Sequence, residues 1–370
     1  MSDQTGEYRL GQGTGPLRGV KVVELAGIGP GPHACMLLAD LGADVVRVDR
    51  PGGAVLSTGD VDVMNRGRPR LEADLKSPDG VALVLDLAER ADVLVEGMRP
   101  GAAERLGLGP DDCWTRNAAL VYGRMTGWGQ DGPLAQTAGH DLNYLGVAGV
   151  LHGLGQDPAR PHFPGNLLGD FGGGSTYLVI GVLAALLEAR VSGQGQVVDA
   201  AIVDGVAHLD AIQVGLLASG MAGPQRLSGV LDGGAPFYDV YETADGQHLT
   251  VAPLEPQFWS AFQELLGVSL PDRDDPSSWP RLRRALSDVF LTRSASDWLD
   301  LFEGSDACVG PVTGYADAPG HPHLAARGTF VEHDGVVQPA PAPRFSRTQA
   351  SLRDDLPDDP AEVLAAWGLD

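Results

Sequence analysis

The sequence has little cysteine, almost no lysine and no long hydrophobic run. Its three cysteines, Cys35, Cys113 and Cys308, are odd in number, far apart and without the spacing of a metal site. This pattern indicates a reducing compartment and argues against a disulfide framework. Lysine occurs only at positions 21 and 76, the chain has 49 acidic residues, and its net charge is −23. Such an acidic chain is not expected to bind nucleic acid or an anionic membrane.

Segments that direct a chain to a membrane or an organelle are not evident. The longest apolar run, Tyr177–Leu187, is shorter than the roughly 20 residues that span a bilayer. The N-terminus lacks the basic start and apolar stretch of a signal peptide, and the last residues, A-W-G-L-D, match no organelle address. We therefore expect a cytoplasmic protein.

The first 205 residues alternate short β-branched runs with helical patterns, which predicts a parallel sheet covered on both faces. The helix expected at 174–190 is apolar nearly all round, which predicts that it is buried. Strands are expected at 20–26, 43–49, 92–96, 119–124 and 195–201, and helices at 33–42, 78–90, 101–107, 174–190 and 202–220.

The pattern then changes. Residues 236–252 alternate around an Asp-Gly turn, which is typical of an antiparallel hairpin, and helices are expected at 256–266, near 280–290 and at 295–303. A proline-rich connector at 338–345 leads to a last helix at 360–367. We predict four segments: a flexible tail at 1–16, a large Rossmann-like α/β domain at 17–222, a small α+β domain at 223–328, and a C-terminal segment at 329–370 that returns to the large domain.

The motif G-I-G-P-G-P at 27–32, with Asp49 ending the next strand, imitates a dinucleotide-binding fingerprint. Pro32 occupies the third glycine position, where glycine would allow close packing of helix on strand, and instead suits the first turn of a helix. We therefore interpret the glycines as a tight turn near some other ligand, and His33 as a helix-start residue. Six basic residues within 30 positions suggest a phosphorylated ligand: Arg47, Arg50, Arg66, Arg68, Arg70 and Lys76.

Three residues at element boundaries are candidates for chemistry, and each also has a structural interpretation. His140 lies in a glycine-flanked turn and Asp170 precedes F-G-G-G-S, where it could cap the following helix. Glu255 precedes a proline that can occupy the first helical position, so it too could be a cap. Together they offer an imidazole and two carboxylates, and the glycine-rich helix start offers N–H groups to an oxyanion.

A series of motifs in fixed order resembles the family III CoA-transferases (the CaiB/BaiF superfamily) and their relatives, from about residue 17 to 347. The closest resemblance is to the α-methylacyl-CoA racemase branch, which pairs the aspartate of G-D-F-G-G-G-S with the histidine of A-G-H-D and adds the glutamate of E-P-Q-F. The motifs are V-V-E-L-A-G-I-G-P-G-P, L-G-A-D-V-V-R-V-D-R-P, A-D-V-L-V-E-G-M-R-P-G, R-M-T-G-W-G-Q-D-G-P, A-G-H-D-L-N-Y, G-D-F-G-G-G-S and G-Q-G-Q-V-V-D-A-A.

The resemblance implies a racemase that inverts the α-carbon of 2-methylacyl-CoA thioesters through an enolate. His140, oriented by Glu255, and Asp170 would exchange the roles of acid and base on opposite faces of the carbon. Backbone N–H groups of Gly172 and Gly173 would stabilise the enolate oxygen. CoA is then part of the substrate, and neither a metal nor another cofactor is expected.

The resemblance also assigns a CoA site, because arginine binds phosphate through planar, bidentate contacts. Arg47 could instead form a salt bridge at the end of its strand, and Arg66, Arg68 and Arg70 could belong to a solvated loop. The residues implied for phosphates, adenosine, pantetheine and thioester are Arg47, Arg50, Ala73, Leu75, Lys76, Gly97, Arg99, Arg105, Gly123, Arg124 and Tyr144.

Members of this family form interlocked dimers, so the resemblance implies a homodimer in which Glu255 completes the site of either its own chain or the partner. Two alternatives stay open: a CoA-transferase with Asp170 as nucleophile, and a non-catalytic acyl-CoA-binding protein. The sequence does not specify the acyl group or the pathway.

Overall fold

The computed structural model describes residues 8–52 and 61–369. These residues form two compact units. The first unit comprises the chain up to Ala148, Pro164–Leu209 and the chain from Ala325; the second comprises Gly149–Phe163 and Asp210–Leu324. The longer segment of the second unit begins at Asp210, whereas the small domain was predicted from residue 223. The second unit also includes the separate segment 149–163.

The first unit contains a six-stranded sheet in the order β3-β2-β1-β4-β5-β6, in which every neighbouring pair is parallel. This is the order of a Rossmann fold, so the predicted α/β class is confirmed. The register places Val23 of β1 beside Val46 of β2 and Leu94 of β4, in the buried centre of the sheet. The strands are β1 (Lys21–Leu25), β2 (Asp44–Asp49), β3 (Arg70–Glu72), β4 (Val93–Glu96), β5 (Val121–Thr126) and β6 (Val197–Ala201).

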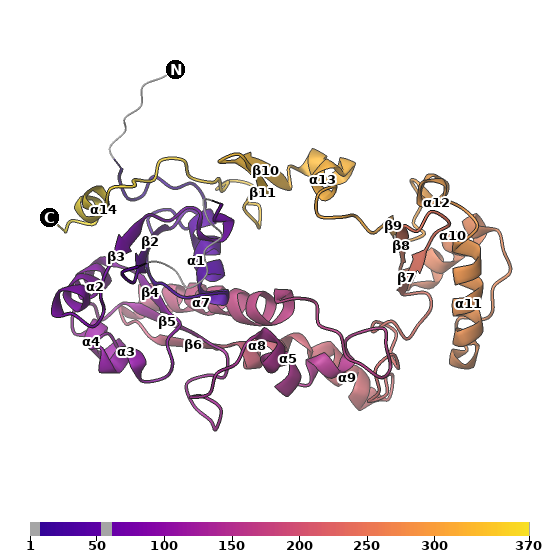
Figure 1. The fold of residues 1–370 in the computed structure, drawn as a ribbon, viewed down its shortest axis with the longest axis horizontal. Helices are drawn as coiled ribbons and strands as arrows, with labels where there is room; N and C mark the ends of the chain where they lie inside the picture. The colour runs from indigo at the N-terminus through magenta and orange to yellow at the C-terminus, as the bar shows by residue number, and fades with distance from the viewer. Residues whose placement is uncertain (1–7, 53–60, 370) are drawn as a thin grey trace, which may run out of the picture. The chain divides into compact units, whose positions relative to one another are not determined.

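Helices cover both faces of this sheet (Figure 1). The helix α1 (Pro30–Asp40) contacts β1, β2 and β4, and α7 (Thr176–Ser192) contacts β5, β6 and α1. The other face packs on α2 (Pro78–Arg90), α4 (Pro110–Trp114) and the C-terminal α14 (Pro360–Ala366), in a core that includes Leu87, Leu94, Tyr122 and Trp367. The side chain of Ser77 caps α2 by accepting the N–H of Gly80 at 3.1 Å.

Helix α7 is not buried on all sides, so that prediction was wrong. Its side toward the sheet is buried, but Ile180, Leu187 and Val191 are 61%, 66% and 90% exposed. The helical stretch Leu167–Ser192 is long and apolar enough to cross a membrane by length and hydropathy, with 44% of its most apolar window buried inside the protein. Core helices of globular proteins can have the same composition, and one face of α7 is buried in the core.

A π-helix, η2 (Leu167–Ser175), precedes α7 and was not predicted. It packs closely on α8 (Ile202–Leu209) at two glycines. A β-carbon on Gly173 would lie 2.6 Å from Cγ2 of Val206, and one on Gly205 would lie 1.9 Å from the carbonyl oxygen of Gly173. The helix expected at 202–220 is interrupted at Asp210, where α8 ends and α9 (Ala211–Ser219) begins.

Residues 8–16 of the predicted flexible tail are packed, because Tyr8 is only 6% exposed and the Arg353 guanidinium lies 5.4 Å from its ring. The N–H of Gly11 donates to Oδ2 of Asp44 at 2.7 Å, and Nη1 of Arg353 lies 2.9 Å from Oδ1 of that residue. Residues 1–7 lie outside the described residues. Smaller elements of this unit are α3 (Ala102–Arg105), α5 (Asp141–Val147), the 3-10 turn η1 (Val63–Asn65), and the antiparallel pair β10 (Phe330–His333) and β11 (Val336–Pro339). The 3-10 turn η4 (Ala318–Gly320) belongs to the second unit.

The second unit has an antiparallel sheet in the order β7-β8-β9 and a core rich in aromatic rings, including Trp259, Phe262, Phe290 and Trp298. The predicted hairpin is present as β7 and β8. Its elements are α6 (Val150–Gly153), α9, β7 (Asp239–Glu242), β8 (His248–Val251), α10 (Pro256–Leu266), the 3-10 turn η3 (Pro276–Ser278), α11 (Trp279–Phe290), α12 (Ala295–Phe302) and β9 (Val309–Pro311), while α13 (Pro322–Arg327) crosses the boundary between the units.

Candidate active site

Seven of the sixteen residues predicted for the site follow strands of the parallel sheet, at its carboxyl edge. Ligands of doubly wound sheets bind outside the carboxyl ends of the strands, where the strand order reverses. Here the order reverses between β1 and β4, and a small pocket of about 80 Å³ lies there, lined in part by Glu24, Gly27, Ile28, Glu96 and Gly97.

The residues assigned to CoA follow successive strands at this edge. Arg50 follows β2, and Ala73, Leu75 and Lys76 follow β3. Gly97, Arg99 and Arg105 follow β4, Arg105 as the last residue of α3. The side chains of Arg50, Lys76, Arg99 and Arg105 are exposed, whereas Ala73 is buried and Leu75 packs against the core.

Arg47 has the second of its two predicted roles, a salt bridge in the strand. It is 1% exposed, its Nη1 lies 2.5 Å from Oε1 of Glu24, and its Nε lies 3.1 Å from Oδ1 of Asp49. The carboxylate of Asp49 is therefore paired with Arg47 of the same strand. Asp49 thus resembles the ribose-binding acid of a dinucleotide fingerprint in sequence position only. Arg47 is therefore buried and ion-paired within the sheet.

The suggestion of a solvated loop at 66–70 was wrong for two of its three arginines. Arg68 is 4% exposed and contacts the other carboxylate oxygen of Glu24, so that Glu24 is held between Arg47 and Arg68. Arg66 pairs with Asp40 at 2.5 Å, and only Arg70 is largely exposed, paired with Asp62 at 2.8 Å. Half of the basic cluster is thus a structural ion-pair network.

Gly123 and Arg124, predicted near the thioester, lie within β5. A β-carbon on Gly123 would lie 3.1 Å from Cδ1 of Leu178, so glycine allows α7 to pack on the strand. Arg124 is 8% exposed and pairs with Glu104 and, at 3.6 Å, with Glu96. Burial raises the pKa of Glu96 to about 7, although the N–H of Met98 donates to its carboxylate at 2.6 Å.

His140 and Asp170 belong to neighbouring elements of the first unit. His140 is exposed and precedes α5, which packs against η2, the π-helix that carries Asp170. Burial raises the pKa of the Asp170 carboxyl, and the charge of His140 opposes this shift. The two candidates are therefore close enough to interact electrostatically, as a shared site requires. The Nδ2 of Asn166 also donates to Oδ2 of Asp170, at 3.3 Å.

The first turn of α5 fixes the backbone of both candidates. The N–H of His140 donates to Oδ1 of Asn143 at 3.0 Å, and the N–H of Asp170 donates to Oδ1 of Asp141 at 2.7 Å. Asp141 and Asn143 were not predicted as site residues, although both stand in the A-G-H-D-L-N-Y motif. Polar side chains in the first turn of a helix could have been recognised as groups that orient backbone N–H donors.

The glycine-rich turn of 27–32 contacts the candidate site. Gly29 has φ +65° and a β-carbon on it would lie 3.3 Å from Oδ2 of Asp170. Four residues on, Nδ1 of His33 lies 2.7 Å from Oγ of Ser175, and its ring stacks on Phe171 at 4.4 Å. His33 is in the first turn of α1, as predicted, and in addition it holds η2 against that helix.

Tyr144 lies behind His140 and is 7% exposed. Its hydroxyl donates to the carbonyl of Gly139 at 2.5 Å, and its ring packs edge-on against Trp128 at 4.8 Å. Burial and the charge of Asp170 raise the pKa of Tyr144. A β-carbon on Gly127 would lie 2.0 Å from this ring, so glycine is required there.

Gly172 and Gly173, the predicted oxyanion donors, lie beyond the first turn of η2. Backbone N–H groups of a π-helix donate to the carbonyl five residues earlier. An oxyanion at these N–H groups would have to compete with the bonds of the helix.

Glu255 belongs to the second unit, where it is exposed and precedes α10. Pro256 occupies the first helical position, as predicted, but the side chain of Glu255 forms no capping hydrogen bond. The nearby thiol of Cys308, which the sequence did not single out, has a pKa raised by burial and by the charge of Glu255.

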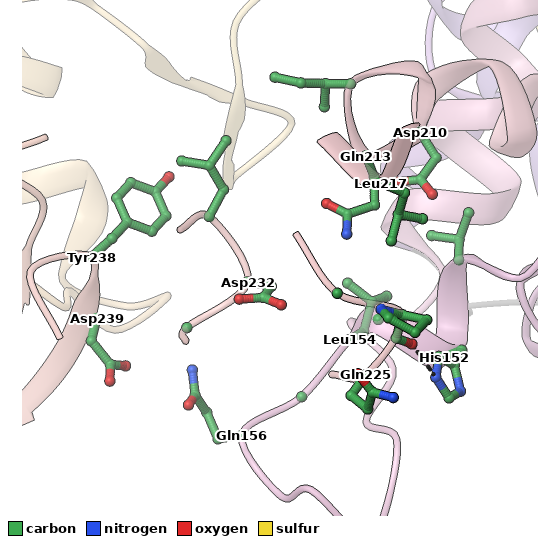
Figure 2. Close-up of a pocket in the computed structure, with 18 of the residues that line it drawn as sticks. His152, Leu154, Gln156, Asp210, Gln213, Leu217, Gln225, Asp232, Tyr238 and Asp239 are labelled. Atoms are coloured by element: carbon green, nitrogen blue, oxygen red, sulfur yellow. Dashed lines mark hydrogen bonds between the residues drawn. The ribbon is translucent and has the colours of Figure 1, made fainter. Parts of the chain in front are cut away.

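The second unit also has a cavity of about 640 Å³ (Figure 2). None of the predicted site residues lines it. Gln213 and Leu217 of α9 border it together with Tyr238 and Asp239 at the start of β7, and Asp232 and Gln156 lie between them. Within the described residues, no three His, Cys, Asp or Glu side chains are grouped as ligands of a metal ion.

The chain is similar to known proteins over nearly its whole length. A sequence profile described as CoA-transferase family III matches residues 17–359. The alpha-methylacyl-CoA racemase of Mus musculus is 41% identical over 361 residues, covering 95% of this chain and 93% of that protein. The succinate–glutarate CoA-transferase of Agrobacterium fabrum is 31% identical over 384 residues, covering 95% of each chain. A crystal structure of a CaiB/BaiF family protein from Brucella suis, 28% identical, matches with a TM-score of 0.81 over 96% of this chain and 100% of that one.

Proposed function

This chain belongs to CoA-transferase family III, and from that premise we propose that it is a racemase of 2-methylacyl-CoA thioesters. Its identity to the mouse racemase, 41%, exceeds its identity to the Agrobacterium transferase, 31%, at similar coverage. The observation that carries the proposal is that His140 and Asp170 lie on two elements that pack together, α5 and η2, and that the charge of His140 acts to lower the pKa of the Asp170 carboxyl.

The reaction needs one group to remove the α-proton and a second to return a proton to the opposite face. In one direction the Asp170 carboxylate takes the proton, the electrons of the broken C–H bond form an enolate, and the imidazolium of His140 protonates the α-carbon. The reverse direction exchanges the two roles. A carboxyl whose pKa is raised by burial suits this work, because it gives up and accepts a proton nearer to neutral pH.

We assign the CoA moiety to the crevice at the carboxyl ends of the strands. Arg99 and Arg105 are exposed there after β4, with Arg50 and Lys76 after β2 and β3, and their charges suit the phosphates of CoA. CoA is part of the substrate in this proposal, and the chemistry uses no resident cofactor or metal ion.

We further propose a cytoplasmic homodimer in which Glu255, of the same chain or of its partner, orients the imidazole of His140. These assignments are carried by the family resemblance. The exposed apolar face of α7, with Ile180, Leu187 and Val191, is a surface that a second copy would cover.

A CoA-transferase is the second candidate, because the family also contains transferases and Asp170 alone would fit a nucleophile. The test is to incubate a single enantiomer of a 2-methylacyl-CoA in deuterated water. Deuterium incorporation with loss of optical purity in the wild type, and no loss of optical purity in His140→Ala, supports the racemase. Transfer of CoA to an added carboxylate, with an Asp170 thioester trapped by hydroxylamine and no exchange, would overturn it. Binding of acyl-CoA without either reaction would indicate a binding protein.

A further inference from the structure

Asp141 is a buried carboxylate at the centre of the candidate site. Asp141 directly follows His140 in the chain and is 7% exposed. Its Oδ1 accepts the N–H of Asp170 at 2.7 Å, and the N–H of Gly169 also contributes a hydrogen bond to the carboxylate. The other oxygen, Oδ2, is buried and has no hydrogen-bond partner in the described residues.

The start of η2 is built to receive this carboxylate. The first N–H groups of a helix have no partner within the helix and need one from outside. Asn166, at the N-cap position of η2, makes no side-chain cap. A carboxylate from α5 fills that role instead, and a β-carbon on Gly169 would lie 2.2 Å from Oδ1 of Asp141. Only glycine at position 169 leaves room for this contact.

A carboxylate is a costly choice for a purely structural cap at this place. Burying a charge is unfavourable unless it is paired, and burial does raise the pKa of Asp141 above its usual range. A neutral Asn or Ser would cap the same N–H groups at lower cost. Its position between the two candidate acid/bases supplies a reason for the charge, because Asp141 raises the pKa of Asp170 while His140 lowers it.

Other groups from α5 and α1 also pack around η2. From α5, Tyr144 is buried and acts on neither carboxylate by hydrogen bonding, since its hydroxyl donates to Gly139. From α1, the backbone of Gly29 faces Asp170, and His33 is bonded to Ser175.

From α8, Asp204 is exposed, and His208 is bonded to Tyr177 of α7 at 2.7 Å. From β5 and β6, Arg124 pairs with Glu96 and Glu104, and Asp199 accepts the N–H of Gln130. Asp141 is therefore the carboxylate that acts directly on Asp170.

We propose that Asp141 is a positioning residue for the proton transfer: its carboxylate holds the backbone of Asp170 at a fixed distance from His140 and keeps the Asp170 carboxyl ready to exchange a proton. This inference rests on the function proposed above. Because Asp141 and His140 are consecutive, the first turn of α5 positions both His140 and the backbone of Asp170.

Two substitutions separate the contact from the charge. Asp141→Asn keeps an oxygen that accepts the N–H of Asp170 but removes the charge. Asp141→Ala removes both. We expect Asp141→Ala to lower kcat by about 10- to 100-fold, the effect of a displacement of about 1 Å, with little change in KM. We expect Asp141→Asn to retain most of kcat and to move the acidic limb of the kcat/KM–pH profile to lower pH, because the pKa of Asp170 falls.

The matched control is Asp204→Asn, an exposed aspartate in the first turn of α8, which should leave both rate and pH profile unchanged. Wild-type kcat in Asp141→Ala together with a wild-type pH profile in Asp141→Asn would overturn the inference. If Asp141→Ala does not fold, the pH profile of Asp141→Asn decides. Asp170→Asn is measured in parallel: if it racemises normally the proposed function fails, whereas if it is inactive and the Asp141 variants are normal only the present inference fails.

Discussion

The backbone of Gly29 lies directly against the carboxylate of Asp170: a β-carbon on the glycine would be 3.3 Å from Oδ2. This contact joins the glycine-rich turn after β1 to the π-helix that carries the candidate acid/base. It explains what the turn does in place of binding a dinucleotide. The turn brings the backbone of a glycine, which has no side chain, against a carboxyl group. The helix α1 follows this turn and carries His33, which is hydrogen-bonded to Ser175.

The Gly29–Asp170 contact predicts that Gly29→Ala lowers the racemisation rate. The new methyl group must displace Asp170, and alanine is also strained at φ +65°. Gly19→Ala is the control, because Gly19 has φ +83° and no atom of the described residues lies within 4 Å of an added β-carbon. Both variants should lose similar stability in urea denaturation, and only Gly29→Ala should lose kcat. Equal kcat in the two variants would contradict the contact.

The buried pair of Arg47 and Glu24 predicts a large loss of stability on removing one partner. Arg47→Met leaves Glu24 buried with one of its two arginines missing, and breaking a buried ion pair costs about 3–5 kcal/mol. Arg116→Met breaks an exposed pair with Asp86 and should change stability little. Denaturant titration measures both. A KM effect without a stability effect in Arg47→Met would instead restore its predicted role in phosphate binding.

The exposed arginines after β4 predict a loss of affinity for CoA thioesters without a loss of catalytic rate. Arg99→Gln and Arg105→Gln should each raise KM about tenfold or more, since a hydrogen bond to a charged group contributes about 1.5–3 kcal/mol. A truncated pantetheine thioester has no nucleotide phosphates and serves as the control substrate. Wild type and variants should process it equally. A fall in kcat at unchanged KM would contradict the assignment of these arginines to the CoA site.

The pKa of Glu96, raised to about 7 by burial, predicts a pH-dependent stability. Folded Glu96 holds its proton where the unfolded side chain has lost it, so its contribution is complete below pH 4.5 and is lost as the pH rises through about 7. Glu96→Gln should flatten this decline, by a few kcal/mol at most, since one pKa unit corresponds to about 1.4 kcal/mol. Urea denaturation at pH 5 and pH 8 tests it, and an identical decline in wild type and Glu96→Gln would contradict it.

The sequence was informative where local pattern and tertiary structure agree. Runs such as V-K-V-V-E-L and D-V-L-V-E predict buried parallel strands, and the structure has β1 and β4 there. The helix expected at 78–90 is present as α2, which begins at Pro78 and is capped by Ser77. Alternation of strands and helices predicts a parallel sheet but not its strand order, since doubly wound sheets have more than one order. The order β3-β2-β1-β4-β5-β6 comes from the structure, and it determines which loops share an edge with the crevice.

The sequence was uninformative where a residue's role depends on distant partners. Arg47 was predicted as a phosphate ligand or a salt bridge of its strand, and Arg68 as a phosphate ligand or part of a solvated loop. Only the fold shows that both arginines contact Glu24. The glycine run of 172–174 has no periodicity that would distinguish a π-helix from a loop. Helix α7 is apolar all round, but the described chain covers only one side of it. Asp141 directly follows His140 in the motif, but the residue whose N–H it accepts, Asp170, is 29 residues further along the chain.

The two-base pairing of His140 with Asp170 is tested most directly by measuring α-proton exchange from each enantiomer separately in deuterated water. A wild-type enzyme should exchange and invert both. His140→Ala should retain slow exchange, without inversion, only from the enantiomer whose proton faces Asp170, and Asp170→Asn only from the other. If either variant still inverts both enantiomers at the wild-type rate, or if both variants lose exchange from the same enantiomer only, the pairing is wrong.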